Sequence, residues 1–137
     1  MKNYKATTQQ EIRAIKASIR HWQDDCLKRY EKRMPVVAAM DVDNCAICRA
    51  FEDIGNNCPN CPLAKIGKNC NLNGSPYNIW KKKDNILMAI HHFEYGIALD
   101  KTSNANNALE AAKTAAKNMI STLKSLLPAK ERKGRYK

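Results

Sequence analysis

Five of the six cysteines in this chain are crowded into one stretch, where they form two Cys-x2-Cys pairs and a single follower. They are Cys45, Cys48, Cys58, Cys61 and Cys70. A gap of two residues lets a tight turn direct both thiolates of a pair at one tetrahedral ion, as in structural zinc sites. The surrounding sequence is rich in Asn, Gly and Pro, which is typical of loops that need an external constraint to be ordered. The sequence therefore predicts a zinc-knuckle loop over residues 41–78.

Five cysteines compete for the four ligand positions of a tetrahedral zinc ion. Our first choice is the set of Cys45, Cys48, Cys58 and Cys61. Cys70 is the alternate, which replaces Cys58 if the loop geometry turns that thiol away. A closed shell of four thiolates leaves no position for water, so we expect the zinc to stabilise the fold without catalysing a reaction.

Two other interpretations of the cysteines are less favoured than zinc. A disulfide framework needs an oxidising compartment, whereas we expect a cytoplasmic chain, since the N-terminus lacks the apolar segment of a secretory signal. A redox pair at Cys58 and Cys61, like that of thioredoxin-type enzymes, needs a surrounding βαβ pattern. No such pattern is visible in the sequence.

The chain of 137 residues has a formal net charge of +11 and a hydrophobic content of 44%. This hydrophobic content is ordinary for a folded protein, and the length fits one domain, residues 1–137, with a real core. The positive charge favours phosphate backbones, acidic proteins and anionic membranes alike. No apolar run approaches the roughly 18 residues of a membrane span, so we expect a soluble protein with no membrane partner.

An N-terminal helix over residues 8–33 is indicated by a capping box and a long apolar stripe. Thr8 is followed three residues later by Glu11, which is the spacing of a capping box. The stripe advances in steps of three and four residues and consists of Ile12, Ile15, Ile19, Trp22, Cys26 and Tyr30. We interpret Cys26 as a buried packing thiol. His21 borders the stripe, where it either packs at the edge of the core or supports the metal site as a neighbour of its ligands.

Two further helices are predicted over residues 80–99 and 103–127, and a mobile, solvated basic tail over 129–137. The first of them can begin with Ser75 as its cap and Pro76 as its first residue, or it can begin later, at Asp84. Its apolar face is expected at Ile86, Ile90, Phe93 and Ile97, with Leu87 and Ala98 nearby. The fold class is therefore mainly α: a small domain of three principal helices, with the zinc-knuckle loop inserted between the first and the second.

Basic side chains concentrate in the N-terminal helix, in a lysine run after Trp80 and in the tail. The residues that we single out as a surface for a partner or for nucleic acid are Lys28, Arg29, Lys32, Arg33, Lys81, Lys82, Lys83, Lys130, Arg132, Lys133 and Arg135. Gathered on one face, they would bind phosphates, with Trp80 and Tyr136 as stacking partners. The alternative is that lysine serves only solubility. No recognition motif accompanies the charge, so binding to DNA or RNA would be directed at the backbone and steeply salt-dependent.

The segment His91-His92-Phe93-Glu94 is the other cluster that carries titratable chemistry. Adjacent residues of a helix point about 100° apart, so His91 and His92 do not converge on one ion. One histidine at the edge of the core and one in water is the simpler interpretation. Gly-rich phosphate loops, nucleophile elbows and zinc-protease helices are absent from the sequence. We therefore expect a binding protein and not an enzyme.

One arrangement of motifs spans roughly residues 20–80 and resembles a group of small bacteriophage and prophage proteins of unassigned function. It consists of His21-Trp22, Cys45-Ala-Ile-Cys48, Cys58-Pro-Asn-Cys61-Pro62, Cys70 and Ser75-Pro76-Tyr77, the last often Thr-Pro-Tyr in those proteins. The resemblance implies a zinc-stabilised helical protein of phage origin in the cytoplasm of a host cell. It suggests host takeover or counter-defence, by binding and inhibiting a host protein or a protein–nucleic-acid complex. Direct DNA or RNA binding is the alternative, and the sequence leaves open whether the chain forms a homodimer.

Overall fold

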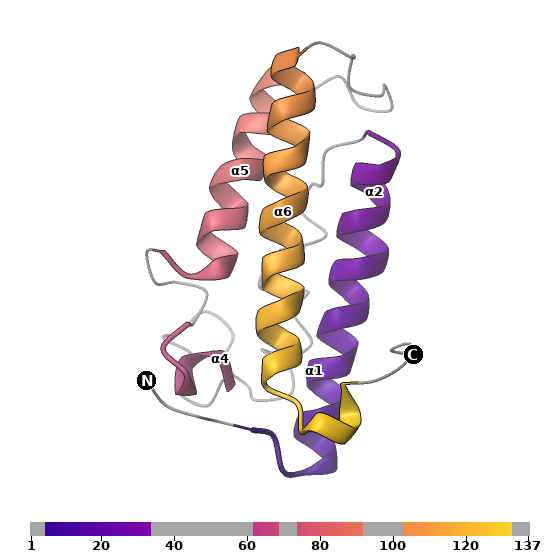
Figure 1. The fold of residues 1–137 in the computed structure, drawn as a ribbon, viewed down its shortest axis with the longest axis vertical. Coiled ribbons are helices and arrows are strands. Elements are labelled where there is room, and N and C mark those ends of the chain that lie inside the picture. Colours follow the sequence, from indigo (N-terminus) through magenta and orange to yellow (C-terminus); the bar gives the residue numbers. More distant parts are fainter. Residues whose placement is uncertain (1–4, 34–61, 69–73, 92–102, 133–137) are drawn as a thin grey trace.

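The computed structural model describes residues 5–33, 62–68, 74–91 and 103–132, and these residues form helices and turns with no strand among them. The prediction of a mainly α fold is therefore confirmed for the described part of the chain. Three long helical segments run along the molecule, and the central one, α6, is antiparallel to the other two (Figure 1). It packs against α5 on one side and against α1 and η1 on the other.

The first segment is one continuous helical run with a widened turn in its middle. Its parts are α1 Gln9–His21, the π-helical η1 Trp22–Leu27 and α2 Lys28–Glu31. The predicted capping box is confirmed: the Glu11 N–H donates to Thr8 Oγ1, and the Thr8 N–H donates to Glu11 Oε1, both at 3.1 Å. Arg33 ends the run with a left-handed backbone, φ 59°, a conformation that often follows the last turn of a helix.

The π-helical turn explains how the predicted apolar stripe stays on one face. Trp22, Cys26 and Tyr30 are spaced by four residues, and each such step over-rotates an ordinary α-helix by about 40°. In η1 the Lys28 N–H donates to Gln23 O, five residues back, which widens the turn and takes up part of that rotation. All members of the stripe are buried, as the sequence predicts, including the Cys26 thiol.

The second long helix, α5, covers Pro76–His91. Ser75 caps it by accepting a hydrogen bond from the Asn78 N–H at 3.3 Å, so the helix begins at Pro76 and not at Asp84. The prediction that Ile86 belongs to its buried face is wrong: Ile86 is 52% exposed, whereas the neighbouring Leu87 is 1% exposed. The part of the predicted helix beyond 91 lies outside the described residues.

The third long helix, α6, covers Ser103–Ser125 and presents an alanine-rich face to its neighbours. A 3₁₀ turn, η4 Ala129–Glu131, follows it and folds back onto α1. There Lys16 Nζ lies 2.6 Å from Glu131 Oε1, and the Arg132 side chain donates to Leu127 O at 2.9 Å. Residues 129–132 of the predicted tail thus form a turn with polar contacts at Glu131 and Arg132, and the mobility of the tail stays a prediction. Residues 133–137 lie outside the described part.

A small part of the predicted zinc-knuckle loop is described. It contains one short helix, α4 Pro62–Lys65, whose Leu63 side chain reaches the core. Gly67 and Gly74 have φ angles of 72° and 81°, which is the left-handed geometry that glycine adopts at turns. None of the described helices combines the length and the apolarity that crossing a membrane requires.

Candidate functional site

The five clustered cysteines, which carry the zinc prediction, all lie outside the described residues. The structure therefore does not place Cys45, Cys48, Cys58, Cys61 or Cys70, and the ligand set stays a prediction. Within the described ranges, no group of three or more His, Cys, Asp or Glu side chains is arranged to hold a metal ion. The side chains of His91 and His92 also lie outside what the structure describes.

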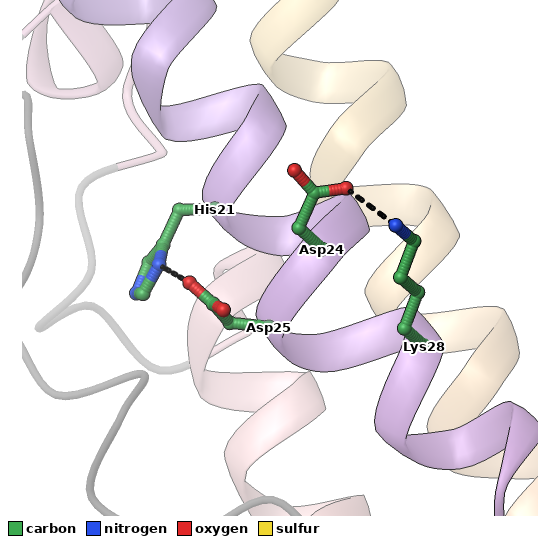
Figure 2. Close-up of polar contacts among 4 residues, drawn as sticks. All are labelled: His21, Asp24, Asp25 and Lys28. Atoms are coloured by element: carbon green, nitrogen blue, oxygen red, sulfur yellow. Dashed lines mark hydrogen bonds and ion pairs between the residues drawn. The ribbon is translucent and has the colours of Figure 1, made fainter.

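His21 projects from the start of the widened turn, and Asp25 closes onto its ring. His21 Nδ1 lies 2.5 Å from Asp25 Oδ2, and the pair is drawn in Figure 2. A carboxylate on one imidazole nitrogen fixes the orientation and the tautomer of the ring, as it does for histidines in metal sites and catalytic sites. The second pair in Figure 2, Asp24 with Lys28 at 3.5 Å, is exposed and contributes little to stability.

A buried polar network joins the first helical run to α5. The Tyr30 hydroxyl donates to Asp84 Oδ1 at 2.7 Å, and Trp80 Nε1 donates to the Tyr30 oxygen at 2.9 Å. Trp22 packs edge-on against the Trp80 ring, with centroids 4.9 Å apart. Buried polar groups are tolerated when such partners satisfy them. The network therefore lets α5 bury an aspartate in the core.

The two titratable groups of the first run that meet this network are held in their neutral forms. Burial, followed by the charge of Asp84, raises the pKa of the Cys26 thiol from 9.0 to about 12. Burial also raises the pKa of Tyr30, with further contributions from Cys26 and Asp84. The thiolate is the nucleophilic form of cysteine, so burial disfavours the reactive form of Cys26. The network is suited to holding helices together.

The predicted basic residues lie at three places in the structure. Lys28, Arg29, Lys32 and Arg33 lie at the end of the first run, where Arg33 donates to Asn106 Oδ1 of α6 at 2.7 Å. Lys81, Lys82 and Lys83 are exposed along α5. Lys130 belongs to η4 and Arg132 follows it; η4 lies at the opposite end of the long axis from α2 (Figure 1). Lys133 and Arg135 lie outside the described residues, and the described basic groups belong to three separate segments of the chain.

The outer face of α5 is the surface feature that sequence reasoning missed. Ile79 and Ile86 are 38% and 52% exposed, and they are the exposed large hydrophobic side chains of the described part of the chain. The lysine run lies between them in the sequence, and the one acidic residue of α5, Asp84, is buried. The sequence carries no local signal for this, because the group that holds Asp84 inside is Tyr30, 54 positions earlier in the chain.

Neither a protein-family model, nor a curated protein, nor a solved structure matches the chain. Function has to be inferred from the residues themselves. They offer a cysteine-rich segment with the spacing of a zinc knuckle, a histidine oriented by a carboxylate, a buried polar network and an exposed basic helix.

Proposed function

We propose that the chain is a zinc-stabilised binding protein that contacts and modulates or inhibits a host protein or a protein–nucleic-acid complex. The observation that carries the proposal is the exposure of Lys82 and Lys83 on α5. Among the described residues these lysines have no ion-pair partner, and they stand beside exposed isoleucines. Exposed apolar side chains beside positive charges suit contact with another molecule.

The buried polar groups of the described core serve the fold. Burial raises the pKa of Cys26 and of Tyr30, and both lie inside the helical core. Raised pKa values keep both groups protonated at neutral pH. The resemblance to small phage proteins adds the setting, a host cell whose machinery the chain blocks or redirects.

Zinc is held in this proposal by Cys45, Cys48, Cys58 and Cys61, with Cys70 as the alternate ligand. The donor chemistry fits the ion, because four thiolates form the closed shell of structural zinc sites. Bound zinc contributes folding free energy, roughly 10–16 kcal/mol in zinc-finger peptides.

Elemental analysis of purified protein tests the zinc site. Stoichiometric zinc is expected in the wild type and in Cys70→Ser, whereas Cys45→Ser and Cys58→Ser should lose it. Zinc retained by Cys58→Ser but lost from Cys70→Ser would establish the alternate set. A metal-free wild type would contradict the site altogether. In His21→Ala, undiminished zinc would remove the supporting role of the His21–Asp25 pair.

Affinity capture from a bacterial host lysate tests the binding role. We expect a stoichiometric protein partner at physiological salt, identified with its subunit count by native mass spectrometry. Failure to retain any protein at low or physiological salt would contradict the proposal. Zinc loading is measured on the same sample, so that a misfolded preparation is recognised.

Direct binding to nucleic acid is the second candidate, favoured by the three consecutive exposed lysines of α5. Fluorescence anisotropy with a short DNA duplex tests it across a salt series. Log affinity should fall linearly with log salt, by about 0.9 per phosphate contact. Each of Lys81→Glu, Lys82→Glu and Lys83→Glu should lower that slope to a similar extent. Binding that ignores salt, or none at low salt, would dismiss this candidate.

A further inference from the structure

The outer face of α5 exposes side chains that helices usually bury. Ile79 and Ile86 are 38% and 52% exposed, whereas Asp84 is 4% exposed. Single apolar residues scattered over a surface need no explanation. These two differ because they lie on one side of one helix with basic residues between them.

Lys82 and Lys83 complete this side of the helix. Each residue of an α-helix is rotated by about 100° from the last, so positions 79, 82, 83 and 86 fall within an arc of about 100°. Residues three and four apart are neighbours on a helix surface. We call these four residues the Ile–Lys face. Lys81 is equally exposed but lies outside the arc.

The Ile–Lys face is separate from the packed side of α5. The helix packs on α6, and its buried Trp80, Asp84 and Leu87 side chains lie outside the arc of the Ile–Lys face. Figure 1 shows α5 at the edge of the three long helical segments, with α6 on one side. The face is therefore a surface of the helical body and not part of its interior.

Charge and apolarity together decide what fits this face. A second copy would set Lys82 and Lys83 against the same lysines, which is repulsive. A DNA backbone suits the lysines but leaves both isoleucines against a hydrated, polar surface. A bilayer demands a broad apolar face, whereas the large apolar side of α5 is used in the core. A protein segment with acidic and apolar side chains can pair with the lysines and cover the isoleucines.

We infer that the Ile–Lys face docks an acidic amphipathic helix of a partner protein. Apolar side chains of that helix cover Ile79 and Ile86, and its carboxylates pair with Lys82 and Lys83. The net charge of +11 steers such a partner toward the chain. The inference rests on the proposed binding function and specifies the chemistry of the partner.

A synthetic peptide tests this chemistry directly. The probe is a fluorescently labelled helical peptide with leucines along one face and glutamates on both flanks, read by anisotropy against the full-length, zinc-loaded chain. Ile86→Ser and the double variant Lys82→Glu/Lys83→Glu should each weaken binding by at least about tenfold. A scrambled peptide of the same composition should bind far more weakly, because its leucines no longer share one face.

Lys81→Glu is the matched control, since it makes the same charge change outside the arc. It should weaken binding by less than about threefold, through long-range charge alone. Circular dichroism melts confirm that every variant is folded. Equal losses in Lys81→Glu and Lys82→Glu, or equal binding of the scrambled peptide, would overturn the inference in favour of undirected charge attraction. Stronger binding to a short DNA duplex than to the peptide, lost equally in all lysine variants, would also overturn it.

The same variants separate this inference from the proposed function. A partner captured from lysate by the wild type and by Lys81→Glu, but not by Ile86→Ser, supports both when the peptide result agrees. A partner captured equally by Ile86→Ser and by Lys82→Glu/Lys83→Glu leaves the binding function standing and overturns the docking face. Capture of nothing by the wild type contradicts the binding function, whatever the peptide shows.

Discussion

The two faces of α5 reverse the usual placement of polar and apolar side chains. The inner face buries an aspartate, Asp84, while the outer face exposes two isoleucines, Ile79 and Ile86. Asp84 is tolerated inside because the Tyr30 hydroxyl donates to it, and a buried charge without partners would be costly. The isoleucines leave 38% and 52% of their surface in solvent. The inner face thus serves stability, and we assign the outer face to binding.

The largest test of this contrast uses adjacent residues. Leu87→Ala should lower the free energy of unfolding by about 2–5 kcal/mol, because it empties a space in the core. Ile86→Ala should change it by less than about 0.5 kcal/mol, since the side chain is half in solvent. Urea denaturation followed by circular dichroism measures both. Similar losses in the two variants would show that Ile86 is packed and that the faces do not differ.

The hydrogen bonds of the inner face give the next largest effect. Tyr30→Phe removes the hydroxyl that joins Trp80 to Asp84, at a cost of about 1–3 kcal/mol for polar groups left without that partner. Asp84→Asn keeps an acceptor oxygen for Tyr30, so it should cost less. Denaturant unfolding of the two single variants and of the double variant measures their coupling. A neutral Tyr30→Phe would mean that packing alone holds Asp84 inside.

Alkaline pH probes the inner face through Cys26. Its pKa is raised from 9.0 to about 12 in the folded chain, so the native state keeps its proton where the unfolded state has lost it. Stability conferred by the buried thiol is therefore full below pH 9 and falls as the pH rises toward 12, by up to about 1.4 kcal/mol per pH unit. Unfolding free energies of wild type and Cys26→Ala, compared across this window, measure the difference in slope.

The clustered cysteines are present in both wild type and Cys26→Ala. Their contribution to the pH dependence of the unfolding free energy therefore cancels in the comparison. Identical pH slopes would show that Cys26 is open to solvent. A thiol-labelling time course adds an independent measurement: the native Cys26 should react with a maleimide only after unfolding, because its thiolate is scarce and buried.

The first helical run shows how much of this fold the sequence could predict. Its cap at Thr8 and its buried stripe depend on residues three or four positions apart, and both are confirmed. The Ser75 cap of α5 is equally local. Local spacing also anticipated Cys26 as a packing thiol. Where neighbours in the sequence decide the structure, residue patterns are sufficient.

The sequence predictions fail where contacts between residues far apart in the chain decide the structure. Asp84 is buried by Tyr30, which lies 54 positions earlier in the chain, so no helical periodicity could reveal it, and the apolar face was assigned to Ile86 instead. The contact between Lys16 and Glu131 likewise joins residues 115 positions apart, so the sequence could not indicate where residues 129–132 lie. The cysteine spacing still predicts a zinc site, and that prediction concerns residues outside the described part.

The smallest expected effect on stability comes from the lysines of the outer face of α5. Lys82→Ala and Lys83→Ala should each change the free energy of unfolding by less than about 0.5 kcal/mol. The sign should be slightly stabilising, because consecutive lysines in a chain of charge +11 repel one another and alanine is the better helix former. Salt should erase the electrostatic part of that gain by screening the charges. Paired thermal melts at low and high salt measure it, and a loss above about 1 kcal/mol would show that these lysines hold the fold together, which would end their assignment to a partner.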